Sequence, residues 1–268
     1  MQHKATLEDT LSLMRDLRAR CEWDAAQTHA SLRPYLIEEA HELDDALRDG
    51  DDRAAREELG DVLLQVLFHS VVAEERGAFG IADVAGGLID KMHRRHPHLY
   101  GDGVRVGWEK MKAERRASIE DGLPSGLPAL HRAHRLQDRA AGVGFDWDDL
   151  AGPADKVAEE LAEVREHLGD AAVVRDGHAP PARTPGFDAL ESELGDLLFA
   201  VVNLCRKAGV HAGLALDRAN AKFVRRFTAI ERLAAARGID VKTAGLAVLD
   251  SLWDEVKRDE RAPGTATG

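Results

Sequence analysis

The feature that most restricts how this chain can fold is an internal duplication. Four short pieces of its first half recur, in the same order, in its second half. The matched pieces are residues 38–42 with 159–163, 58–63 with 193–198, 91–95 with 222–226, and 108–112 with 253–257. The spacing between partners differs from pair to pair, so insertions fall between the pieces and not inside them. Such a repeat predicts that both halves fold into the same unit.

The residue types favour helices in both halves. Aromatic residues make up 5% of the chain, strand-like alternation is scarce, and Ala, Leu, Glu and Arg recur at helical spacing. We therefore predict an all-α fold, a tandem repeat of two helical domains. Glycine and proline clusters divide the chain into a first domain at 1–121, a linker at 122–152 with a short helix over 131–141, a second domain at 153–260 and a disordered tail at 261–268. Residues 176–186, which are rich in proline, predict a mobile loop.

Charge and cysteine content narrow the class of function. The formal net charge is −12 at pH 7, which argues against a nucleic-acid partner because such proteins present dense Lys and Arg surfaces. Cys21 and Cys205 are the only cysteines, which favours a reducing compartment. The start of the chain lacks the apolar core of a signal peptide, and the most apolar stretch, residues 62–73, is too short for a membrane span. We expect a cytoplasmic protein without a membrane partner.

Acidic residues gather on one side of the expected helices. On the first helix, Glu38, Glu39 and Glu42 form an arc beside an apolar stripe. On the second helix, apolar residues fill most of the circumference, so we predict that it is largely buried. Glu58 and Asp61 lie on its one narrow polar stripe, and the second repeat places Glu193 and Asp196 in the same way.

Buried carboxylates that converge need a multivalent cation, because an unpaired buried charge is costly. Oxygen ligands without cysteine select Mg²⁺, with Mn²⁺ as a substitute. The predicted ligands are Glu159, Glu160, Glu163, Glu193 and Asp196 in the second repeat and Glu38, Glu39, Glu42, Glu58 and Asp61 in the first. We expect Glu160, Glu163, Glu193 and Asp196 to be catalytic.

Glycine and histidine positions add two further expectations. Glycine in the middle of a helix costs about 1 kcal/mol relative to alanine, so Gly60 and Gly195 predict the close approach of another helix or of the metal. The pair Glu38 and His41 suggests half of a di-iron site, but the second repeat has Ala162 where a second histidine would be needed. The other histidines, His29 and His69 among them, are expected on the surface or in loops.

Basic residues at i, i+4 spacing are candidates for binding the phosphates of a substrate. Lys222 with Arg226, and Lys91 with Arg95, lie on one helical face each. An ordinary solvated basic face is the alternative. Trp253 with Lys257 could supply a stacking surface and a further phosphate contact, as could Trp108 with Lys112, although a tryptophan is equally well explained as a core anchor.

With these motifs, the sequence resembles the long, two-repeat form of the MazG family of nucleoside triphosphate pyrophosphohydrolases. Further matching pieces are Trp23-Asp24 with Gln27-Thr28, residues 94–98, 127–130, 143–147 and 222–227. The resemblance implies tandem helical domains, a homodimer in which helices from two subunits build each site, Mg²⁺ dependence, and release of pyrophosphate from several NTPs or dNTPs. It also implies a role in nucleotide-pool sanitation or stress-related nucleotide control, and it ranks the C-terminal site first.

Water would attack the triphosphate at this acid site, and pyrophosphate would leave with the metal. The acidic residues and the metal do not determine which nucleobase the enzyme accepts. A narrow-specificity enzyme acting on dUTP, dCTP or phosphoribosyl-ATP is therefore an alternative. A non-catalytic helical dimer that binds nucleotides or a protein is another. Both acid sets are complete, so the residues themselves favour neither repeat.

Overall fold

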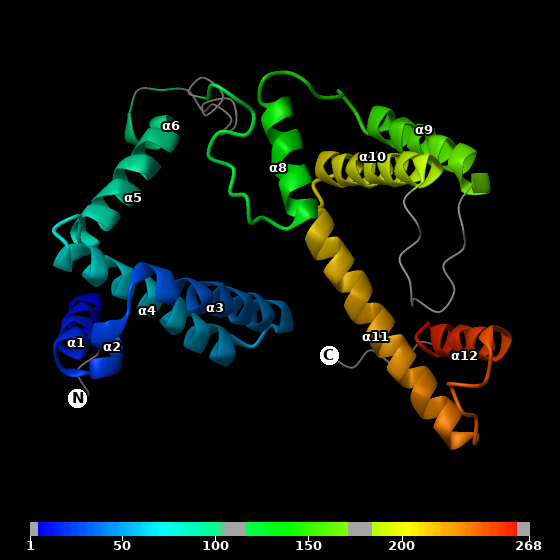
Figure 1. The fold of residues 1–268 in the computed structure, drawn as a ribbon, viewed down its shortest axis with the longest axis horizontal. Coiled ribbons are helices and arrows are strands. Elements are labelled where there is room, and N and C mark those ends of the chain that lie inside the picture. The colour runs from blue at the N-terminus through cyan, green and yellow to red at the C-terminus, as the bar shows by residue number, and fades with distance from the viewer. Residues whose placement is uncertain (1–4, 102, 104–115, 171–183, 262–268) are drawn as a thin grey trace. The chain divides into compact units, whose positions relative to one another are not determined.

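A computed structural model describes residues 5–101, 103, 116–170 and 184–261 of the chain. Within these ranges every regular element is a helix (Figure 1), which confirms the all-α prediction. The chain divides into two compact units, Met1–Arg105 and Val106–Gly268. Residues 108–112, with Trp108 and Lys112, lie outside the described ranges, as do most of the proline-rich insert and of the predicted tail.

The first unit contains α1 (Leu7–Arg20), α2 (Glu22–Ala26), α3 (His29–Asp49), α4 (Asp52–Glu75), α5 (Ile81–Arg95) and α6 (Pro97–Tyr100). Its central motif is the α3–α4 hairpin. Thr28 caps α3 through reciprocal bonds with Ser31, and Gly50 ends that helix in the left-handed region at φ 71°. The Asp51 side chain then accepts hydrogen bonds from the first amides of α4. This tight turn lays α3 and α4 side by side.

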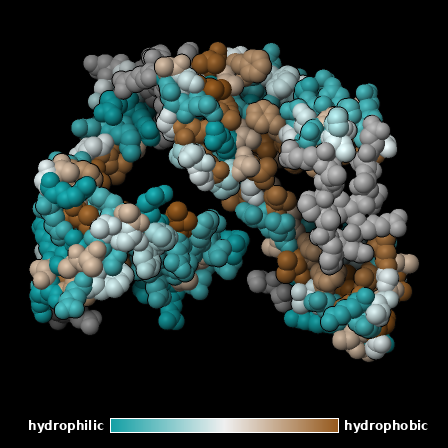
Figure 2. All heavy atoms as spheres, in the orientation of Figure 1, coloured by the Kyte–Doolittle hydropathy of each residue, from teal (hydrophilic) through white to brown (hydrophobic). Residues whose placement is uncertain are grey.

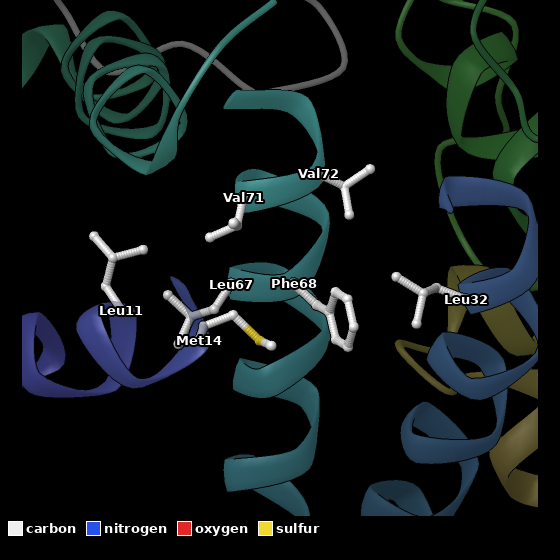
Figure 3. Packing of buried hydrophobic residues seen from close by; sticks show 7 residues of the cluster. All are labelled: Leu11, Met14, Leu32, Leu67, Phe68, Val71 and Val72. Atoms are coloured by element: carbon white, nitrogen blue, oxygen red, sulfur yellow. The ribbon is translucent and has the colours of Figure 1, made fainter. Parts of the chain in front are cut away.

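The core of the first unit lies where α1 and α3 contact the C-terminal half of α4. Leu67, Phe68, Val71 and Val72 of α4 pack with residues of α1 and α3 (Figure 3). The partners are Leu11 and Met14 from α1 and Leu32 from α3. Because these contacts use one end of α4, the acidic half of the helix is left with α3 as its neighbour.

The second unit contains α8 (Ala129–Ala141), α9 (Ala151–His167), the 3₁₀ turn η1 (Leu168–Asp170), α10 (Pro185–Lys207), α11 (Ala212–Ala236) and α12 (Leu246–Asp259). Helices α9 and α10 pack along one another and repeat the α3–α4 pair (Figure 1). The short helix predicted at 131–141 is α8, and it packs on α10 and α11. A second core joins Ile230 and Ala234 of α11 to Leu252 and Val256 of α12.

The prediction that the second helix of each repeat is largely buried is wrong for the single chain. Leu59 is 55% exposed and Leu198 is 59% exposed. Both helices carry an apolar stripe, a row of apolar side chains at equivalent positions of the two repeats. The stripes are Leu59, Leu63 and Val66 on α4 and Leu194, Leu198 and Val201 on α10. Each helix has neighbours on only part of its circumference, and hydrophobic residues lie open on the surface of both units (Figure 2).

The predicted close approach at the two helical glycines is also not found. Among the described residues, a Cβ atom at Gly60 or at Gly195 would meet nothing within 4 Å. Packing within the described part of the chain therefore does not explain these two glycines.

The expectation for His29 and His69 is corrected as well: their half-buried rings stack with centroids 5.1 Å apart.

No single described helix is long and apolar enough to cross a membrane. The pair α10 and α11 passes that test only when both helices are taken together, and the pair is bent by 102°.

Candidate metal centres

The first acidic cluster lies on the α3–α4 hairpin. Glu39 and Glu42 extend from α3 and Glu58 from α4, and one carboxylate oxygen of each lies within 4.8 Å of the others. Asp61 is close enough for its charge to repel that of Glu39. Glu38 is exposed and stands outside the trio. The hairpin thus brings together three of the five predicted ligands of the first repeat.

The second cluster repeats this arrangement on α9 and α10. Glu160, Glu163 and Glu193 each offer a carboxylate oxygen within 4.8 Å of the other two. Glu160 is 5% exposed, which makes it the most deeply buried acid of either trio. Asp196 lies one turn beyond Glu193 and is exposed. Glu159 is outside the trio and pairs with a lysine instead.

Carboxylates held this close raise one another's pKa. Burial raises the pKa of Glu39, and repulsion from Asp61 and then Glu42 raises it further. The pKa of Glu58 rises for the same reasons, burial first and Glu42 next. In the second cluster, burial and then Glu160 raise the pKa of Glu163. A divalent cation would remove this penalty, and hard oxygen donors from two helices suit Mg²⁺, so the residues present fit the predicted ion.

Lys156 gives the second cluster a cation of its own. Its Nζ lies 2.7 Å from Glu160 Oε1 and 2.9 Å from Glu159 Oε1. These hydrogen bonds, the one to Glu160 first, raise the pKa of Lys156 above its ordinary value. The first repeat has Tyr35 at the matching position, one turn before its acids. The two clusters therefore differ in charge although their carboxylates match.

An apolar cavity of about 660 Å³ adjoins the second cluster. Lys156, Glu160 and Asp196 belong to its lining, so the acids and the cavity form one continuous site. Most of the remaining lining is apolar, from α8, α10 and the segment before α9. These residues include Leu136, Ala140, Phe145, Trp147, Phe199 and Ala200.

Two contacts hold the aromatic wall of this cavity. A Cβ atom at residue 152 would lie 2.0 Å from Trp147 Cδ1, so the indole packs where only glycine leaves room. Asp146, between the two aromatic residues, pairs with both Arg206 and Lys207 of α10. These ion pairs attach the segment 145–147 to the helix that carries Glu193.

The residues predicted to bind phosphate lie together on the α11–α12 hairpin. Arg226 Nη2 is 2.7 Å from Glu260 Oε2, and its guanidinium lies 5.6 Å from the centre of the Trp253 ring. Lys257 pairs with Asp254 at 2.8 Å, and Lys222 is exposed on α11. None of these contacts reaches a carboxylate of the second cluster.

Trp253 packs beside the α11–α12 core and against Phe223, as expected of a core anchor. In the first unit, Lys91 and Arg95 are half-buried on α5. Their contribution to a phosphate site stays a prediction.

Sequence reasoning missed Lys156, Gln137 and the aromatic wall of Phe145 and Trp147. Lys156 could have been predicted, because its i, i+4 spacing from Glu160 places the two side chains next to each other on one face of the helix. Two aromatic residues within three positions, in a chain with 5% aromatics, also stood out. Gln137 carried no signal, since only tertiary packing buries it.

The fold and site define an all-α protein in which a duplicated helix pair holds carboxylates suited to a divalent cation. The MazG nucleotide pyrophosphohydrolase domain family matches residues 27–100 and, a second time, residues 154–230. The two matches cover the two acidic helix pairs, and the chain belongs to this family.

Several curated proteins are similar over most of the chain. It is 42% identical over 259 residues to the nucleoside triphosphate pyrophosphohydrolase of Escherichia coli (strain K12), covering 92% of this chain and 94% of that protein. The nucleoside triphosphate pyrophosphohydrolase/pyrophosphatase MazG of Thermotoga maritima is 42% identical over 259 residues, with 93% and 95% covered. The nucleoside triphosphate pyrophosphohydrolase of Mycobacterium tuberculosis is 39% identical over 173 residues, with 61% and 51% covered.

Proposed function

We propose that this chain hydrolyses nucleoside triphosphates to the monophosphate and pyrophosphate in the presence of Mg²⁺ or, as a substitute, Mn²⁺. The observation that carries the proposal is the trio of Glu160, Glu163 and Glu193 beside an apolar cavity large enough for a nucleoside. The names of relatives that are 42% identical over nearly their whole length support it. A role in nucleotide-pool sanitation or stress-related control follows from the same likeness.

Glu160, Glu163 and Glu193, with Asp196 next to them, would hold the metal ion. Bound Mg²⁺ would neutralise charge on the phosphate oxygens and lower the pKa of a water molecule. A carboxylate of the cluster that the metal leaves free is suited to take the proton of the attacking water as general base. Lys156, which already lies among the acids, can turn toward a phosphate once a metal takes its place.

The basic hairpin would hold the far phosphates of the substrate. Lys222 and Arg226 offer two cations on one face of α11, and Arg226 can form a bidentate contact once released from Glu260. Trp253 and Lys257 would act beside them. For this role, the hairpin must meet an acidic cluster, and in the proposed homodimer it would be the hairpin of the other subunit.

The uncovered faces of α4 and α10 support that homodimer. Apolar residues repeat at i, i+4, i+7 on both helices, and the midhelical glycines beside them leave room for another helix. A second copy of the chain would cover these stripes and complete the burial that the sequence predicts. Because both repeats have the same stripe, each would find its counterpart in the other subunit.

The direct test is Glu193→Gln, with the first cluster disabled by Glu58→Gln so that turnover reports on the second. We expect pyrophosphate release from ATP to fall by about 100-fold or more with unchanged helical circular dichroism, because the metal loses a charged ligand. Glu166→Gln on the exposed side of α9 is the matched control and should retain activity. Activity equal to the control in the Glu193→Gln variant would contradict the proposed site.

The alternatives separate in the same assay. A panel of NTPs and dNTPs distinguishes a broad pyrophosphohydrolase from a narrow one that accepts only dUTP-like or dCTP-like substrates. A non-catalytic nucleotide-binding dimer would bind ATP with Mg²⁺ and release no pyrophosphate. The proposed enzyme should lose turnover with EDTA and regain it with added Mg²⁺.

A further inference from the structure

Three histidines meet where α8 packs on the start of α11 (Figure 1). His131 and His134 lie three positions apart on α8, and His211 is the N-cap residue of α11. The centroid of the His211 ring lies 5.0 Å from that of His131 and 5.1 Å from that of His134. All three residues are half-buried. The contact between the two helices therefore contains a cluster of imidazoles, the side chain whose ordinary pKa lies nearest to neutral pH.

The neutral form of His211 stabilises the start of α11. Its Nδ1 accepts a hydrogen bond of 3.3 Å from the Leu214 amide, so this nitrogen carries no proton. Protonation would turn Nδ1 into a donor and break the cap. The new positive charge would also lie at the end of the helix where the macrodipole disfavours cations. A charged His211 is therefore incompatible with this helix start.

The environment of the two α8 histidines also favours rings without charge. Nδ1 of His134 is buried and has no hydrogen-bond partner, so a proton on that atom would meet neither an acceptor nor solvent. Burial, as the largest cause, lowers the pKa of His134. Burial, followed by His211, lowers the pKa of His131. Each proton added to the cluster thus costs more than it would on an exposed ring.

The neighbouring charges do not offset a positive cluster. Among the described residues, Arg135 and Asp138 of α8 are the charged groups that act on the two α8 rings. Asp138 favours their protonation, but its Oδ2 already lies 2.6 Å from Arg135 Nη1, and Arg135 opposes protonation. At the C-terminal end of α10, which also packs on α8, Arg206 and Lys207 pair with Asp146. The carboxylate of Asp138 is thus shared with a guanidinium.

We propose that these three histidines form an acid-sensitive junction, which holds α8 against α11 while the rings are neutral and releases α8 in mildly acidic solution. Once two rings are charged, they repel one another across the helix contact, and a charged His211 no longer caps α11. Release of α8 would also change the second site, because Leu136, Gln137 and Ala140 of α8 line the cavity beside its acids. The junction would thus link acidity to the shape of that cavity.

Hydrogen exchange of the full chain, measured by mass spectrometry at about pH 7.5 and about pH 5.5 with EDTA present, tests the junction. Correction for the intrinsic effect of pH on exchange gives an opening equilibrium for each segment. An opened α8 takes up protons at a higher pH than the closed one, so the contact is fully stable above about pH 6.5 and loses stability as the pH falls through the lower folded pKa.

We expect the protection of residues 129–141 to fall by about 10-fold or more at the lower pH, a factor of about ten for one proton across one pH unit. Residues 246–259 of α12, in the same unit, should keep their protection.

The variant His131→Gln/His134→Gln/His211→Asn removes the titrating groups, and its asparagine can still cap α11. Its change in protection should shrink to about 2-fold or less. His167→Asn, which removes a half-buried histidine of α9 outside the cluster, is the matched control and should respond like the wild type. If the triple variant does not fold, His211→Asn alone leaves α8 unchanged and should show a smaller change than the wild type.

Equal protection of residues 129–141 at the two pH values in the wild type would overturn the inference. An undiminished change in the folded variant would do the same, as would a wild-type loss that extends equally to residues 246–259, because acid would then unfold the whole unit. These measurements do not use turnover, so the inference stands or fails independently of the proposed function.

Discussion

At the scale of single residues, both acidic trios hold carboxylates close enough to repel one another. Glu39 is held beside Asp61, Glu42 and Glu58 without a lysine at the position that Lys156 occupies in the second repeat. Burial first, and then repulsion from these carboxylates, raise its pKa, which means that the folded chain disfavours its charged form. Residues placed in this way serve ligand binding at the expense of stability.

Glu39→Gln should therefore stabilise the metal-free protein while weakening its response to Mg²⁺. Loss of one charge from the trio should raise the melting temperature by roughly 1–3 °C, equivalent to about 0.5 kcal/mol for a partly exposed group. The shift induced by added Mg²⁺ should decrease, since a ligand is lost. Thermal denaturation with and without Mg²⁺ measures both. Glu38→Gln, outside the trio, is the control, and the same Mg²⁺ response in both variants would contradict the assignment.

At the scale of elements, two histidines join α3 to α4 in one defined protonation state. Arg76 at the C-terminus of α4 donates to His29 Nε2 at 2.9 Å. His29 must then carry its proton on Nδ1, which donates to His69 Nδ1 at 2.8 Å. His69 is consequently neutral, with its proton on the buried Nε2. Burial, and then His29, lower the pKa of His69 from its ordinary 6.5.

This lowered pKa predicts that the first unit loses stability in acid. The unfolded chain binds a proton at His69 at a higher pH than the folded chain does, so stability falls as pH decreases from about 6.5 through the lower folded pKa. The slope is at most about 1.4 kcal/mol per pH unit. Urea unfolding at about pH 7.5 and pH 5.5 measures it.

His69→Asn is the informative variant, because the asparagine oxygen can accept the His29 proton but does not titrate. It should show a smaller loss of stability between the two pH values than the wild type. An identical loss would mean that the pair does not control the acid response.

At the scale of the whole molecule, the apolar stripes of α4 and α10 determine the expected assembly. Leu198→Arg should place a charge in the proposed subunit contact and shift the proposed dimer to monomers in light scattering, with helix content retained. Leu246→Arg, at the first residue of α12 and 84% exposed, is the control and should leave the mass unchanged. A Leu198→Arg protein that remains fully dimeric would exclude this face as the contact.

Much of the fold and of the two acidic clusters could be predicted from the sequence, because helical periodicity and helix spacing are local. Glu160 and Glu163 share a helical face by spacing alone. The duplication identified Glu193 as the residue of the second repeat that corresponds to Glu58 of the first. Burial was not predictable in the same way. An apolar stripe such as Leu194 and Leu198 predicts burial against another apolar surface. The sequence of the stripe does not indicate whether that surface belongs to the same chain or to another.

The sequence by itself determined that the chain is helical and duplicated and that its acids converge, since these depend on residue types at fixed spacing. Only the tertiary structure decided which acids meet, that Lys156 lies among them and that an apolar cavity adjoins them. Such contacts join residues far apart in the chain, and they depend on how α8, α9 and α10 pack. Side chains of one helix are placed by its turn, whereas sites between helices are placed by packing.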